Sequence, residues 1–281
     1  MWRAWPVLLT VVALACELTE VTVPEGEPRV VVQAVLSVGA PQQIVVVERS
    51  LTGSVARDSG DPYVPPGEPR LPIDSATVIL THEGPSACAS PVDTLRAQDT
   101  RGVYVTSDGF CDLVAGDRVQ LWIETPDGTV VTGQTTVPGA RWVSVRLSAD
   151  SATASHQDFS LDRQRDTVRI AVDPILWRGL QVEMRESTQP DSLAVYLFTD
   201  TLGVALPGNL INPFEGDTGK PVFEVGKWYN LTVAVVDSNY FDFVRSASDP
   251  ITGRGFLNHL EGGIGVFGSV APYRFGIHVV R

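Results

Sequence analysis

The stretch RVQLWIE, Arg118–Glu124, shows the pattern that decides the fold class of this chain. Its apolar residues Val119, Leu121 and Ile123 fall at every second position, so they lie on one face of an extended strand. Such alternation is typical of a β-sheet with one buried face. Thr167–Val172 repeats the pattern with valine, isoleucine and valine on one face.

Similar short runs rich in Val, Ile, Thr and aromatic residues recur along the chain between Gly, Pro, Asp and Ser turns, which is typical of an all-β protein. The only helix we expect is one or two turns over Tyr240–Ala247. Many short strands with frequent turns indicate a β-sandwich or barrel. The further predicted strands are Arg29–Val38, Gln43–Arg49, Ala76–His82, Gly102–Thr106, Thr129–Val137, Trp142–Leu147, Leu180–Arg185, Leu193–Thr199, Tyr229–Val236, Ile264–Phe267 and Arg274–Val280.

The length of 281 residues allows two such domains. A turn at Val137-Pro138-Gly139 closes the last strand of the first half, so we place the boundary there. The sequence thus predicts a first β domain over residues 28–138 and a second, antiparallel β domain over residues 139–281.

The N-terminus has the layout of a secretory signal, with Arg3 followed by an uncharged apolar run that is too short to span a bilayer. The run ends at Ala13-Leu14-Ala15-Cys16, which resembles the lipobox of bacterial lipoproteins. We therefore predict a signal peptide over residues 1–15, a lipid on Cys16 and a polar tether over residues 16–27. The alternative is ordinary cleavage after Ala15, which would leave Cys16 as a free thiol.

The chain has three cysteines, an odd number for an exported protein. If Cys16 carries lipid, Cys88 and Cys111 remain to form a disulfide in an oxidising compartment. Such a bridge would contribute about 3 kcal/mol by the chain-entropy estimate. A metal site is the alternative, which we disfavour because two cysteines without a histidine near them make a poor zinc site.

The charge of the chain argues against binding to nucleic acid. Without residues 1–15 the chain holds 20 basic against 33 acidic side chains, a net charge of −13. An acidic surface repels phosphates and anionic lipid headgroups. Attachment to a membrane is therefore expected through the lipid on Cys16.

Gly263–Gly268 formally matches the G-x-G-x-x-G pattern of dinucleotide sites. Pro272 follows where a helix would be needed, so we disfavour nucleotide binding. Gly263 and Gly265 instead share one face of a strand, where another backbone or a flat ring can approach closely. We favour close packing of two layers over a ligand slot.

Aromatic side chains offer a second candidate surface, because flat rings stack on sugars. Most of these side chains are expected in the core. Only Trp177 and Trp228 stand beside turn residues, and they are the candidates for exposure. Segment 237–240, Asp-Ser-Asn-Tyr, offers oxygen ligands for calcium, but Asx residues are common in turns and we favour a turn.

No catalytic or metal-binding motif stands out, and no cofactor is expected. The four histidines are scattered without metalloprotease spacing, and no G-x-S-x-G elbow is present. Two carboxylates of a glycosidase would be defined by their distance in space and not by sequence. We therefore expect a protein that is not an enzyme and keep a hydrolase as the least favoured alternative.

Two stretches resemble known families. The order of Ser75–Leu80, Gly102–Tyr104, Leu113–Leu121 and Pro126–Gly128 is similar to immunoglobulin-like or transthyretin-like β-sandwiches found beside outer-membrane transporters. Phe256–Gly268, preceded by Asn212-Pro213-Phe214 and Ser238-Asn239-Tyr240, resembles the C-terminal hallmark of domain-of-unknown-function family 4249.

The second resemblance covers nearly the whole mature chain. It implies an outer-membrane lipoprotein of Bacteroidetes-type bacteria, often encoded beside a TonB-dependent receptor, and it brings no established activity. The sequence therefore predicts an accessory and interaction partner of a TonB-dependent uptake or assembly complex. The alternative is a lipoprotein that binds glycans or peptides directly.

Overall fold

The computed structural model describes residues 27–50, 71–86, 88, 90–108, 110–147, 151–152, 158–211, 220–247 and 257–281. The predicted signal peptide, Cys16 and all of the tether except Glu27 lie outside the described residues.

The described chain is built from strands and one helix, which confirms the all-β prediction. The helix α1, Ser238–Ala247, starts two residues before the predicted one. Within the described residues, no helix has the length and apolar character needed to cross a bilayer. The strands of the first half are β1 Val30–Ser37, β2 Ile44–Arg49, β3 Thr77–Glu83, β4 Val92–Thr94, β5 Arg96–Ala97, β6 Val103–Val105, β7 Arg118–Glu124 and β8 Val130–Thr136. Those of the second half are β9 Gly139–Arg146, β10 Ser151–Ala152, β11 Asp158–Leu161, β12 Thr167–Ile175, β13 Gly179–Glu186, β14 Gln189–Thr199, β15 Gly203–Pro207, β16 Trp228–Val236, β17 Leu260–Glu261 and β18 Ile264–Val279.

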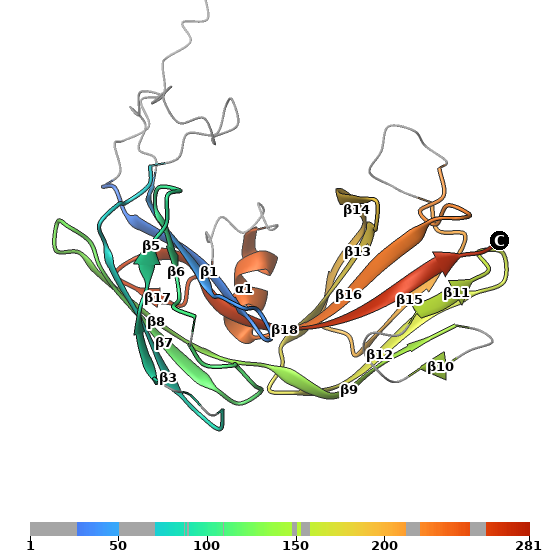
Figure 1. The fold of residues 1–281 in the computed structure, drawn as a ribbon, viewed down its shortest axis with the longest axis horizontal. Helices are drawn as coiled ribbons and strands as arrows, with labels where there is room; N and C mark the ends of the chain where they lie inside the picture. The colour runs from blue at the N-terminus through green and yellow to red at the C-terminus, as the bar shows by residue number, and fades with distance from the viewer. Residues whose placement is uncertain are drawn as a thin grey trace, which may run out of the picture.

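These strands form two β-sandwiches that share one long sheet (Figure 1). This sheet, called sheet A, has the strand order β14-β13-β16-β18-β1-β2-β6-β5, with β11 also paired to β18. Sheet B, ordered β17-β8-β7-β3-β4, covers sheet A in the first sandwich. Sheet C, ordered β10-β9-β12-β15, covers it in the second.

Each sandwich has its own core, made by the alternation seen in the sequence. In the first core, Val32 and Leu36 of β1 face Leu80 of β3 and Leu121 of β7, all fully or almost fully buried. The second core gathers Ile170, Val182 and Leu231 with their neighbours. Burying one such aliphatic side chain contributes about 1.5–3 kcal/mol, so these faces stabilise the two layers.

Strand β18 runs through both sandwiches. Its first half, from Ile264 to Val270, pairs with β1 in parallel. Its second half pairs with β16 from Val270 to His278 in antiparallel orientation, and its last residues also pair with β11 in parallel. Sheet A is therefore mixed, whereas the sequence predicts an antiparallel second domain. The predicted boundary at 138/139 separates β8 from β9, but β17 and the first half of β18 return to the first sandwich.

Pro272 lies inside this strand and does not divide it, whereas the sequence predicts two separate strands on either side of it. It falls after the last residue paired with β1, Val270, and before the first paired with β11, Gly276. On that side no described strand pairs with β18 at Pro272, so the missing N–H removes no ladder hydrogen bond between described strands.

Candidate functional site: a polar groove on sheet B

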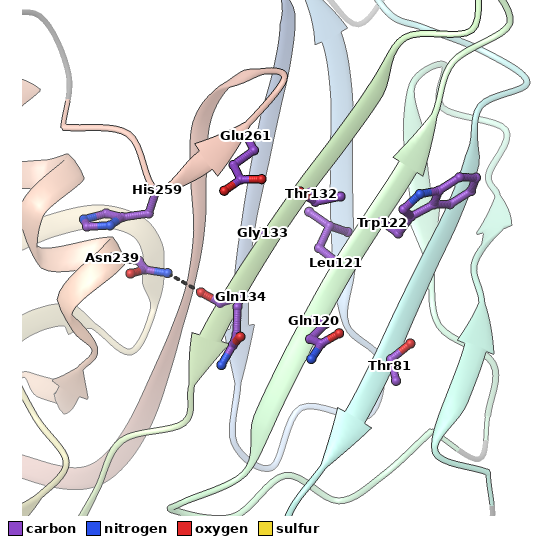
Figure 2. Close-up of a pocket in the computed structure, with 10 residues that line it drawn as sticks. All are labelled: Thr81, Gln120, Leu121, Trp122, Thr132, Gly133, Gln134, Asn239, His259 and Glu261. Carbon is purple, nitrogen blue, oxygen red and sulfur yellow. Dashed lines mark hydrogen bonds between the residues drawn. The ribbon is translucent and has the colours of Figure 1, made fainter.

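The outer face of sheet B carries a groove with a volume of about 480 Å³ (Figure 2). It runs from His259 and Asn239 on one side, across Gln134 and Gln120, to Thr81 and Trp122 on the other. Its lining residues are Thr81, Gln120, Leu121, Trp122, Thr132, Gly133, Gln134, Asn239, His259 and Glu261.

Strand alternation explains why these side chains face outward. On β7 the residues Val119, Leu121 and Ile123 fill the core, so Gln120 and Trp122 lie on the opposite face. The register then places them in rows across the sheet: Gln120 lies between Thr81 of β3 and Gln134 of β8, and Trp122 between Ile79 and Thr132. The floor of the groove is therefore a ladder of amides and hydroxyls with one indole.

One wall of the groove is formed by the segments around α1 and β17. The Asn239 side chain donates from Nδ2 to the carbonyl oxygens of Gln134 (2.7 Å) and Phe267 (2.9 Å), which fixes the first turn of α1 to both sheets. His259 Nε2 lies 3.1 Å from a carboxylate oxygen of Asp242. Glu261 stands opposite Thr132 in the β8–β17 pair.

A second hollow of about 510 Å³ adjoins the first and shares Gln134 and Asn239 with it. It is lined also by Trp177 and by Arg118 and Arg178, and it extends toward the second sandwich. Arg178 stacks its guanidinium 4.7 Å from the centre of the Phe241 ring. Each hollow thus contains a tryptophan, Trp122 in the first and Trp177 in the second, and the amides of Gln134 and Asn239 lie where the two hollows meet.

Asp237 joins the start of α1 to β8 beneath the second hollow. It is buried and precedes α1, where Oδ1 accepts from the backbone N–H of Tyr240 (2.9 Å) and Oδ2 from the Thr135 hydroxyl (2.6 Å). The hydroxyls of Thr135 and Ser269 lie 2.7 Å apart, which continues the network into β18. Burial raises the pKa of Asp237 above its usual value despite these hydrogen bonds. The segment Asp237–Tyr240 is thus a helix cap rather than the simple turn we expected.

The structure separates the four residues proposed from sequence as a ligand or packing surface. Trp177 is half-buried against the second core and lines the second hollow. Trp228 is 43 % exposed and stacks on His278, with ring centres 4.5 Å apart. A side chain at Gly263 would meet Val131 of sheet B, and one at Gly265 would overlap the Val32 carbonyl oxygen of β1.

Cys88 and Cys111 form a disulfide, as predicted. The reason given against a metal site is wrong, because His82 Nδ1 lies 3.1 Å from Cys88 Sγ. His82 Nε2 lies 3.1 Å from Asp117, and both side chains are almost completely buried. Burial alone would raise the pKa of Asp117, but hydrogen bonds from the Val114 and Ser86 backbones and from His82 outweigh it and hold this pKa below its usual range.

Sequence reasoning counted Trp122 among the aromatic residues mostly expected in the core, and it missed the two glutamines and His82, although the same alternation carried the signal. Trp122 and Gln120 occupy outward positions of a strand whose inward residues are all aliphatic. His82 occupies an inward position of β3, in line with Val78 and Leu80. A histidine at a core position six residues before a cysteine indicates a polar cluster, whereas the convergence with Asp117 depends on tertiary structure.

A family model described as Domain of unknown function (DUF4249) matches residues 17–274. A search of curated proteins found no match. The family match spans both sandwiches and the groove. The chain therefore belongs to the DUF4249 family.

Proposed function

We propose that this chain is a non-enzymatic accessory lipoprotein of an outer-membrane uptake or assembly complex, and that it holds an extended, hydroxyl-rich ligand of the glycan type in the groove on sheet B. The observation that carries the ligand is the row of outward amides, Gln120 and Gln134, next to the half-buried indole of Trp122. Amides donate and accept hydrogen bonds, as sugar hydroxyls do, and an aromatic ring covers the apolar face of a sugar.

The shape and charge of the groove also support this ligand class. A shallow groove along a sheet suits an extended chain better than a compact cofactor, which is usually held in a deep, mostly apolar pocket. Arg118 and Arg178 in the second hollow extend the choice to glycans that carry a carboxylate or sulfate. An extended peptide is the alternative occupant, and a peptide arm in the binding test separates the two.

Replacing Trp122 with alanine is expected to weaken glycan binding about tenfold or more, because loss of a stacked aromatic ring at the centre of a site costs more than about 1.4 kcal/mol. The measurement is retention of the full chain on immobilised oligosaccharides and peptides of defined composition, followed by titration of the best binder. Trp228→Ala is the matched control, because this tryptophan is exposed but lines neither hollow.

Equal binding by Trp122→Ala and wild type, or retention on no oligosaccharide, would refute a glycan site on sheet B. Retention on peptides alone would assign the groove to the alternative ligand class.

The membrane anchor is tested separately. Cys16→Ala is expected to abolish incorporation of a clickable palmitate analogue and to release the chain from the membrane fraction, since no other anchor is proposed. Wild type, and not this variant, is expected to co-purify with a TonB-dependent transporter after mild detergent extraction. Undiminished labelling of Cys16→Ala would disprove the anchor while leaving the groove untouched.

A further inference from the structure

The buried cluster around the disulfide is a further chemical feature, separate from the groove. Three side chains converge there: His82 on β3, Cys88 in the loop that follows, and Cys111 before β7. Their potential ligand atoms, His82 Nδ1 and the two Sγ atoms, all lie within 4.8 Å of one another. His82 and Cys111 are each only 5 % exposed.

The neighbours of His82 show which of its ring nitrogens carries the proton. Asp117 is fully buried and lies 3.1 Å from Nε2. The Ser86 hydroxyl oxygen is also close, 2.9 Å from Nε2. A protonated Nε2 can donate to both oxygens, whereas an unprotonated one would place its lone pair against a buried carboxylate, so we assign the proton to Nε2. The carboxylate is further held by the backbone N–H groups of Val114 (2.8 Å) and Ser86 (3.1 Å).

With this proton on Nε2, the Nδ1 lone pair is directed at Cys88 Sγ, 3.1 Å away. A sulfur in a disulfide has no hydrogen to donate, so among the described residues the bond between Cys88 and Cys111 gives this buried acceptor no donor. A cation placed between the three atoms would use the lone pair.

The donor set matches a known type of site. Two thiolates and one imidazole, with a fourth position left open, bind zinc, and soft thiolates also select monovalent copper. A metal-binding histidine commonly gives its other ring N–H to a carboxylate, which is the role that Asp117 already has toward His82.

We propose that the dithiol form of this cluster binds one thiophilic d¹⁰ cation through Cys88 Sγ, Cys111 Sγ and His82 Nδ1, with Asp117 orienting the imidazole. The disulfide and the metal-loaded dithiolate are two states of one site. An external dithiol opens the disulfide by giving two electrons and two protons and becomes a disulfide itself. The cation then displaces both thiol protons as the two sulfur–metal bonds form.

The test uses the full chain, either oxidised or reduced with a phosphine and desalted without oxygen. Zn²⁺ and Cu⁺ are titrated in separate arms against a chromophoric chelator. We expect one equivalent to bind to the reduced chain in at least one arm and none to the oxidised chain. Asp117→Asn is expected to weaken binding about 10–100-fold, and His82→Gln at least as much, while the control His278→Gln leaves it unchanged.

X-ray absorption of the loaded wild type needs no variant and is expected to show two sulfur and one nitrogen neighbours. Circular dichroism follows the fold in each state. The proposal is overturned if the reduced chain binds no more cation than a Cys88→Ser/Cys111→Ser chain, if His82→Gln binds as tightly as wild type, or if reduction unfolds the protein.

Discussion

Replacing Gly265 with alanine is expected to lower the free energy of unfolding by about 2–6 kcal/mol. Gly265 has φ of +120°, a conformation that residues with a Cβ adopt at a cost of about 1–3 kcal/mol. The added methyl would also overlap the carbonyl oxygen of Val32, its partner on β1, and such overpacking costs about 1–3 kcal/mol more. The measurement is urea unfolding of the purified chain, followed by circular dichroism.

Gly39→Ala separates the backbone strain from the overlap. Gly39 has φ of +73° and lies at an exposed site, where an added methyl would have no other atom within 4 Å, so its replacement is expected to cost only about 1 kcal/mol. Equal losses in the two variants would show that strain alone acts and that β1 and β18 can separate to admit a side chain.

The close approach at Gly265 also illustrates what the sequence could and could not predict. The glycine pattern of Gly263–Gly268 was sufficient to predict close packing as an alternative to nucleotide binding. The partner of that packing was not predictable, because a parallel pair between β1 and β18 joins residues more than 230 positions apart. Local alternation identifies a strand and its buried face, but it carries no information about which strand lies beside it.

The same limit applies to the groove. Alternation on β7 already places Gln120 and Trp122 on the outward face, so one row of the site was within reach of the sequence. Asn239, His259 and Glu261 come from the C-terminal part of the chain. His259 and Glu261 reach sheet B because β17 pairs with β8, and Asn239 because its side chain donates to the Gln134 carbonyl oxygen. The predicted boundary at 138/139 assigned these three residues to the second domain, so the sequence did not predict that they lie on sheet B.

Replacing Asp237 with alanine is expected to lower the free energy of unfolding by about 2–4 kcal/mol. Loss of the helix cap, which is the hydrogen bond from the Tyr240 N–H, costs about 1 kcal/mol, and loss of the acceptor of the buried Thr135 hydroxyl costs about 1–3 kcal/mol more. Because Asn239 holds the same helix turn to Gln134, loosening of α1 should also disturb the groove. Urea unfolding measures the first effect, and glycan titration measures the second.

Asp237→Asn is the matched control, and at higher pH it is expected to raise the free energy of unfolding instead of lowering it. Asparagine also caps helices, and its Nδ2 can donate to Thr135 Oγ1 while the Thr135 hydroxyl donates to Ser269.

Because burial raises the pKa of Asp237 above 3.8, the folded state holds this proton more tightly than the unfolded chain does. The stability that this carboxyl gives in its protonated form is therefore present below about pH 3.8 and is lost as the pH rises through the folded-state pKa. The unfolding free energies of Asp237→Asn and wild type should differ little below about pH 3.8, and between there and about pH 8 the difference should grow in favour of asparagine as the pH rises through the folded-state pKa. A constant difference across this range would show that Asp237 titrates alike in the folded and unfolded chains, and that its hydrogen bonds from Thr135 and Tyr240 fully offset the burial of its charge.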